Sequence, residues 1–277
     1  MFTRFGRVDA EKAIIAYPRG IRTPFHVSLS NKFISRNKQG KNALPEGMFV
    51  SKKNGEHRFL PRARVTAPTS GNRIKVGNPY CFVPGDVLEI LNPSAMLTVS
   101  GVGEAGITYN NQTFKYIPVG AANATEAATI LAANFNRIPN LSKNLEFIAS
   151  GANLYVYSPA GRPLATFTPS GTLGSSETTT AANTVPVGTV ASIDPVTEEI
   201  LLSGNVVGNL PVGSSIGVPQ DEVLGIFPHS IDFTEGGVTG RALGVVHKAY
   251  IYKLHLPYYD NSLVYECPDL EAREVWS

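Results

Sequence analysis

The chain has 277 residues, which is long enough for one large domain or two modest ones. Hydrophobic residues make up 43% and charged residues only 17%, with 26 Gly and 20 Pro, a composition typical of a turn-rich β protein. No apolar run approaches the roughly 20 residues of a membrane span, and the only cysteines, Cys81 and Cys267, exclude a disulfide framework. We expect a soluble protein made in a cytoplasm, without signal peptide or membrane partner.

The charge is divided unevenly along the chain. Residues 1–75 hold 16 Lys/Arg against four Asp/Glu, a net charge of +12, whereas the remaining residues hold eight against 18, a net of −10. A basic segment of this kind binds nucleic acid, an anionic surface or an acidic face of another copy.

Residues 1–58 are expected to form an extended basic N-terminal arm. Gly and Pro interrupt every apolar run, and residues 31–42 carry four cations with only two large apolar side chains. Such a segment buries little apolar surface on its own. Contacts with a partner surface must therefore offset the conformational entropy that the segment loses when it becomes ordered.

A mainly β fold is predicted, with a small β-barrel or β-meander body formed by residues 59–96 and 183–256. Short runs such as 73–76, 87–91 and 199–202 alternate with turn signals, among them Pro84-Gly85-Asp86. Residues 242–254 give the longest strand signal.

Residues 97–168 show a different pattern of apolar and turn residues, which predicts an inserted α+β (ββαββ) subdomain. Strand 113–117 follows an Asn110-Asn111 turn, and strands 145–148 and 153–157 close the unit. Between them we expect a helix, capped by Asn123 or Thr125 and ended by Pro139. Its apolar face would consist of Ala127, Leu131, Phe135 and Ile138. Residues 169–182 would be a linker, and 257–277, with five acids, an acidic C-terminal arm.

Two chemical motifs lack the context that their chemistry requires. Residues 101–106 fit GxGxxG, but a strand instead of a helix follows. Residues 213–217 fit GxSxG, but prolines on both sides argue against a nucleophile elbow. The five histidines show no metal-binding spacing. We therefore expect no catalytic residue, cofactor, metal or small-molecule substrate, and hence no enzyme.

The predicted insert resembles a module of tailed-bacteriophage structural proteins. The similarity lies in TFKYIP (113–118), TEAATILAANFN (125–136) and ASGANLYVYS (149–158), which match its hairpin, helix and closing hairpin in order. The module occurs in capsid, tail and fibre proteins alike.

The flanking segments are similar in order and character to phage head decoration (cement) proteins. The resemblance lies in LPEGMFVSKKNGEHRFLPRARV (44–65), PGDVLEIL (84–91), GTVASIDPVTEEILLSG (188–204) and the run from 223 to 257. It implies a virion protein on the outer capsid surface that binds the major capsid protein and copies of itself, commonly as a homotrimer. Within the arm, the expected capsid and subunit docking surface consists of Arg7, Arg19, Arg22, Lys32, Arg36, Lys38 and Lys41.

Two alternatives remain. One is a phage tail or fibre component whose insert binds a host surface. The other is a nucleic-acid-binding protein that uses the basic segment, in which Phe and Tyr are interleaved with cations, although no recognition module is present.

Overall fold

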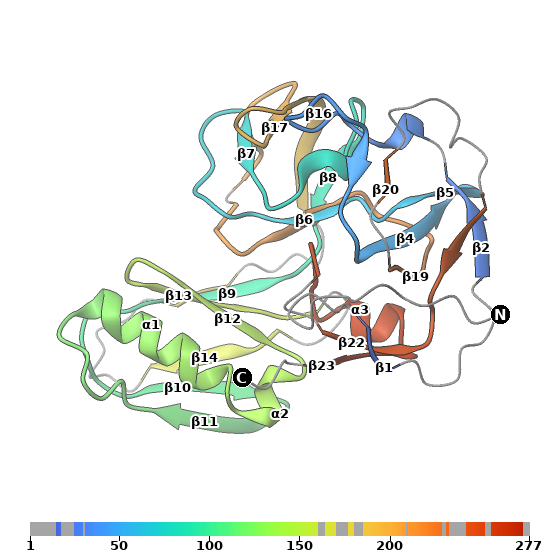
Figure 1. Ribbon diagram of the computed structural model, residues 1–277. Coiled ribbons are helices and arrows are strands. Elements are labelled where there is room, and N and C mark those ends of the chain that lie inside the picture. Colours follow the sequence, from blue (N-terminus) through green and yellow to red (C-terminus); the bar gives the residue numbers. More distant parts are fainter. Residues whose placement is uncertain are drawn as a thin grey trace.

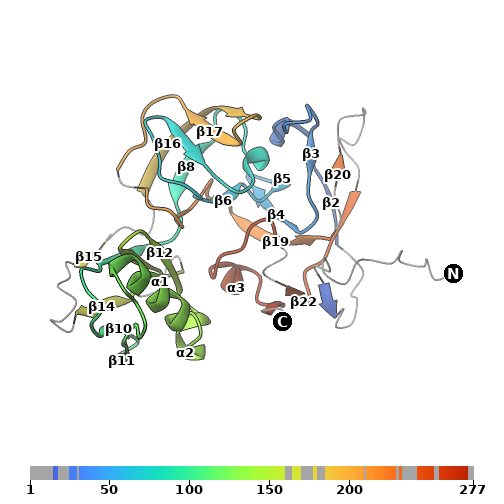
Figure 2. The ribbon, with the colours of Figure 1, turned by 60° about the vertical axis from the view of Figure 1, so that its left-hand side comes forward.

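The computed structural model describes residues 15–17, 25–29, 31–159, 164–169, 177–179, 185–208, 210–228, 231–232, 242–252 and 256–273. Within these residues the fold is mainly β, as the sequence predicts, and the buried apolar side chains form three separate cores. We call the three parts the β-body, the inserted unit and the C-terminal unit. Figures 1 and 2 show the inserted unit beside the other two.

The β-body is built on a six-stranded antiparallel sheet with the order β6-β18-β8-β16-β17-β7. Its strands are β6 (Arg62–Arg64), β7 (Arg73–Lys75), β8 (Val87–Ile90), β16 (Val185–Asp194), β17 (Glu199–Leu202) and β18 (Ser215–Gly217). An isolated bridge between Val65 and Val76 joins the chain just beyond the two edge strands, so the sheet curls toward a barrel. Register shifts on either side of Gly188 let β16 pair first with β8 and then with β17.

Smaller sheets complete the β-body and connect it to the C-terminal unit. They contain β2 (Phe25–Ser28), β3 (Ala43–Leu44), β4 (Met48–Lys53), β5 (Glu56–Phe59), β19 (Glu222–Phe227), β20 (Ile231–Asp232) and β21 (Ala242–Val245). β4 lies between β19 and β5, while β2 pairs with β21 and β3 with β20. The Asn54-Gly55 turn between β4 and β5 has positive φ at both residues, as a two-residue hairpin requires. Two 3-10 helices, η2 (Asn31–Phe33) and η3 (Pro79–Cys81), lie beside these strands.

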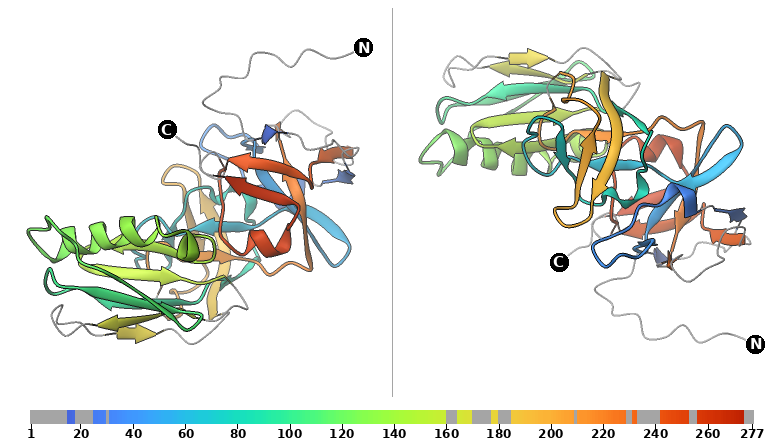
Figure 3. Two further views of the ribbon diagram at one scale, coloured as in Figure 1. Left: turned by 90° about the horizontal axis from the view of Figure 1, so that it is seen from below. Right: turned by 90° about the horizontal axis from the view of Figure 1, so that it is seen from above.

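The inserted unit contains two sheets and the longest helix of the described chain. Its elements are β9 (Ser94–Thr98), β10 (Ala105–Tyr109), β11 (Gln112–Tyr116), α1 (Ala124–Phe135), α2 (Pro139–Ser142), β12 (Glu146–Ser150), β13 (Asn153–Tyr157), β14 (Thr166–Pro169) and β15 (Glu177–Thr179). The sheet orders are β12-β13-β9-β15 and β11-β10-β14. Helix α1 packs on β12 and β13, and Figure 3 shows it on the side of the unit opposite β14 and β15.

The start of α1 agrees with its sequence signals. Asn123 is the cap, and its side chain accepts a hydrogen bond from the Glu126 amide (3.0 Å), while the Glu126 carboxylate accepts one from the Ala122 amide (2.8 Å). This arrangement is similar to a capping box, except that the Glu126 carboxylate reaches the amide of the residue before the cap. On the buried face, the rings of Phe135 and Phe147 lie 5.1 Å apart.

The C-terminal unit joins segments from both ends of the chain. β1 (Ile15–Tyr17) is antiparallel and β23 (Leu270–Arg273) parallel to the central strand β22 (Ala249–Tyr252), and α3 (Leu263–Glu266) precedes β23. The third core includes Phe49, Leu60, Ile226, Ile251 and Leu270. The core therefore also takes side chains from β4, β19 and the residue after β5.

Several described segments differ from the predicted organisation. Residues 43–58 of the predicted arm form β3, β4 and most of β5, and Leu44, Met48 and Val50 are buried in the first core. The described part of the predicted acidic arm, 257–273, packs into the third core. Within the predicted linker, β15 pairs with β9, and the strand predicted at 242–254 is divided into β21 and β22. For residues 43–58 and 257–273, the cores that bury them include strands from distant parts of the chain.

Candidate functional site

Four of the predicted docking residues lie on one exposed stretch that starts at η2. All four side chains are exposed to solvent, and we call them the basic ridge: Lys32, Arg36, Lys38 and Lys41. The other three predicted docking residues, Arg7, Arg19 and Arg22, lie outside the described residues.

The basic ridge is held on the β-body by main-chain contacts. The Ser35 amide donates to the Tyr80 carbonyl (2.9 Å), which ties the stretch to η3. The Asn37 carboxamide oxygen accepts from the amides of Gln39 and Lys41, both at 3.0 Å, and so fixes the loop between them. Because the backbone is held, the cations are displayed on a defined surface.

The ion pairs of the basic ridge are solvent-exposed. Lys32 pairs with Glu56, and Lys38 lies 3.6 Å from a Glu198 carboxylate oxygen. The side chains in both pairs are between 38% and 59% exposed. Exposed pairs contribute roughly 0–1 kcal/mol, so an anionic partner could replace these carboxylates at little cost.

Directly below the basic ridge lies a buried ion pair that the sequence did not reveal. Arg58 donates to both carboxylate oxygens of Asp86 (2.9 and 2.8 Å) and to the Cys81 carbonyl (3.0 Å), with both charged side chains less than 10% exposed. The Phe33 ring has the Lys32 Nζ and the Arg58 Cζ each 4.7 Å from its centroid. One aromatic ring thus connects the ridge with the interior.

Two further arginines of the basic segment join the three units. Arg62 forms two hydrogen bonds with the Glu266 carboxylate of α3 (2.6 and 2.7 Å). Arg64 pairs with Glu146 of β12 (2.6 Å) and donates to the Tyr259 carbonyl (2.7 Å). Burial is the largest single influence and opposes the charge of Arg62, but the bond to Glu266 and the nearby charges of Asp260 and Glu266 together outweigh it, so the pKa of Arg62 is raised. These cations link the three units and do not belong to the basic ridge.

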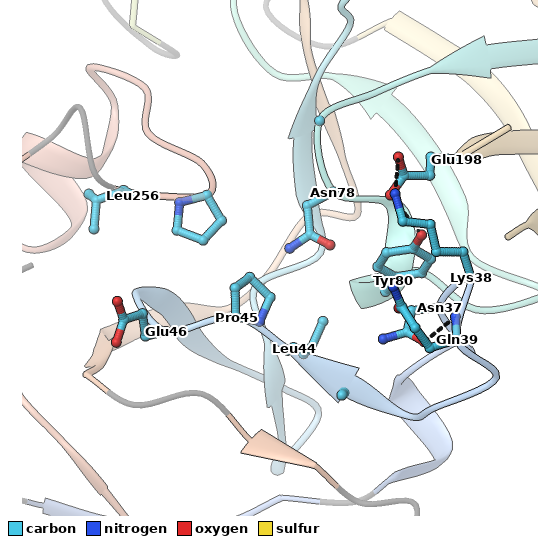
Figure 4. A pocket seen from close by; sticks show the side chains of 13 residues that line it. Asn37, Lys38, Gln39, Leu44, Pro45, Glu46, Asn78, Tyr80, Glu198 and Leu256 are labelled. Atoms are coloured by element: carbon cyan, nitrogen blue, oxygen red, sulfur yellow. Dashed lines mark hydrogen bonds and ion pairs between the residues drawn. The ribbon is translucent and has the colours of Figure 1, made fainter. Parts of the chain in front are cut away.

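A groove of about 720 Å³ runs beside the basic ridge, and Figure 4 shows its side chains. Its two sides come from the ridge loop with β3 and from the chain around η3, and Leu256 and Pro257 close one end. The Tyr80 hydroxyl donates to the Glu198 carboxylate at 2.9 Å. Burial, together with this contact to Glu198, raises the pKa of Tyr80 to about 12, so the hydroxyl keeps its proton at neutral pH.

A second hollow of about 490 Å³ lies where the three units meet. It shares Gly77, Leu256 and Pro257 with the first groove and continues to Arg64 and Glu146. We call the two hollows together the long groove. Sequence reasoning missed it because its lining comes from all three units.

The motifs set aside in the sequence have no catalytic geometry. Gly101–Gly106 covers the end of the β9–β10 connection and the first two residues of β10, and it opens no helix. Ser214 and Ser215 are buried at the start of β18, without the helix that a nucleophile elbow requires. In the described part of the chain, no three His, Cys, Asp or Glu side chains are grouped to hold a metal ion. None of its helices is long and apolar enough to cross a bilayer.

Comparisons with known proteins do not assign the chain to a family. No family model matches the chain, and no curated protein matches it. Among solved structures it is similar to a chain from Mycobacterium phage Patience, with 10% identity over 75% of this chain and 95% of that chain and a TM-score of 0.26. A likeness at this level does not establish a common fold.

Proposed function

We propose that the protein is a non-catalytic structural component of a phage virion, a capsid cement (decoration) protein. In this proposal it binds the outer surface of the major capsid protein as a homo-oligomer, such as a trimer, and stabilises contacts between capsomers. The observation that carries the proposal is the basic ridge, four exposed cations on a hydrogen-bonded loop of the β-body. The sequence resemblance to decoration proteins supplies the class of partner.

The electrostatics favour an acidic protein surface as the partner. Exposed cations on a fixed loop can pair with carboxylates of a shell, and many weak contacts per particle add up through multivalency. Nucleic-acid binding is less well supported, because Arg58, Arg62 and Arg64 are engaged in ion pairs within the protein. The charge available to a phosphate backbone is therefore smaller than the sequence suggests.

Charge reversal of the ridge tests the proposal. The variant K32E/R36E/K38E/K41E should fold but sediment at least about tenfold less with phage heads that lack this protein. A matched control, K75E/K115E/R137E/K143E, reverses four exposed cations elsewhere and should bind nearly as the unchanged protein does. Equal binding by both variants would overturn the ridge as the docking surface.

Location on the particle is tested separately with gold-labelled antibody. Labelling over the head surface is the expected result. Labelling confined to the tail would refute the capsid assignment and support the alternative in which the inserted unit binds a host surface. Deleting residues 1–42 would not test the docking role of the ridge alone. It would also remove Ile34 from the first core and the hydrogen bond of Ser35 to η3.

A further inference from the structure

The long groove has a shape that suits the binding of an extended polypeptide. Its two hollows of about 720 and 490 Å³ share Gly77, Leu256 and Pro257, so they lie next to each other between the basic ridge and the inserted unit. Small-molecule sites are usually single concave pockets of roughly 300–1,000 Å³. Two adjacent hollows that share one wall offer a longer surface, which suits an extended segment.

The chemistry of the lining is mixed and slightly acidic. Pro45, Leu256 and Pro257 supply apolar surface. Three carboxylates, those of Glu46, Glu198 and Glu146, face two cations, Lys38 and Arg64. Glu198 and Glu146 have cationic partners, whereas Glu46 is exposed and has no ion pair with any described residue. An occupant with arginines among apolar side chains would complement this surface.

The register of β1 points to the source of such a segment. Ile15 lies opposite Ile251 in an antiparallel pair, so the N-terminal end of β1 faces the direction in which the chain leaves β22. Leu256 follows the end of β22 by four residues in the sequence and lines both hollows. Residues 1–14 precede β1, and at roughly 3.3 Å per residue they could extend about 45 Å.

We infer that the long groove is the docking site of residues 1–14 of the same chain, which we call the leader. The leader sequence MFTRFGRVDAEKAI has Phe2, Phe5 and Val8 for the apolar lining and Arg4 and Arg7 for the carboxylates. The short connection through β1 gives the leader a high effective concentration at its own groove, which favours it over a second copy. The inference concerns the free protein and does not depend on capsid binding.

Photo-crosslinking in the full-length protein tests this inference. Phe5 is replaced by p-benzoylphenylalanine, and ¹⁵N-labelled and unlabelled copies are mixed before irradiation. The expected result is crosslinks from position 5 to the lining segments 37–46, 77–80 and 256–261, with both peptides from the same isotope pool. Crosslinks at these segments between isotope pools would show that the leader of a second copy occupies the groove and would overturn the same-chain assignment.

Two charge variants make the test specific. Glu46→Lys reverses the exposed carboxylate in the groove and should lower the crosslink yield about threefold or more. Asp269→Lys changes an exposed carboxylate outside both hollows and should leave the yield unchanged. An absence of crosslinks to the groove, or equal yields in both variants, would overturn the inference. The assay contains no phage heads, so its failure is distinct from failure of the proposed function.

Discussion

Arg64 of the β-body and Glu146 of the inserted unit form an ion pair 2.6 Å long between two separate cores. The side chains are 22% and 35% exposed, and the same guanidinium donates to the Tyr259 carbonyl of the C-terminal unit. Other contacts across this junction are also polar, such as the bond from the Tyr157 hydroxyl to the Val212 carbonyl (2.7 Å). Polar interfaces between units permit relative motion more readily than large apolar ones.

This junction leads to a prediction about coupling between the units. In a double-mutant cycle of Arg64→Met and Glu146→Gln, guanidinium unfolding should give a coupling free energy of about 1 kcal/mol, because the pair is only partly buried. Each single variant should also raise hydrogen exchange in β12 and β13 more than in β8. A coupling energy of zero would mean that other contacts, such as the one made by Tyr157, hold the inserted unit.

The buried pair under the basic ridge should be far more costly to break. Arg58→Met leaves the Asp86 carboxylate buried and without its partner, so the free energy of unfolding should fall by about 3–5 kcal/mol. The double variant Arg58→Met/Asp86→Leu should recover part of this loss. As a control, Arg73→Met removes an exposed cation paired with Asp194 and Glu199 and should cause little change in the unfolding midpoint. Equal effects of Arg58→Met and Arg73→Met would contradict this ranking.

Local sequence signals predicted the elements that local interactions determine. The cap at Asn123, the buried positions Ala127, Leu131 and Phe135, and the turn at Asn110-Asn111 all agree with the structure. These features depend on contacts within a few residues, and cap and turn preferences describe such contacts directly.

Long-range pairing explains what the sequence did not reveal. Arg62 and Glu266 are 204 positions apart, and no periodicity links them. Residues 48–53 appeared too short and too interrupted for a core element, yet β19 and β5 pair with the two edges of β4, and its side chains enter the first and third cores. The net charge of the basic segment overstated its exposed charge for the same reason, since neutralising carboxylates come from distant parts of the chain.

The two buried thiols predict a loss of stability at alkaline pH. Burial is the main cause that raises the pKa values of Cys81 and Cys267 from 9.0 to about 12. Between these values the unfolded chain releases thiol protons that the folded protein retains, so stability falls as pH rises above about 9, by up to about 1.4 kcal/mol per pH unit for each thiol. Guanidinium midpoints at pH 8, 9 and 10 measure this slope. In Cys81→Ala/Cys267→Ala the slope should be shallower, because only other groups such as Tyr258, whose pKa is also raised by burial, still contribute. Identical slopes in the two proteins would show that the thiols are not the source.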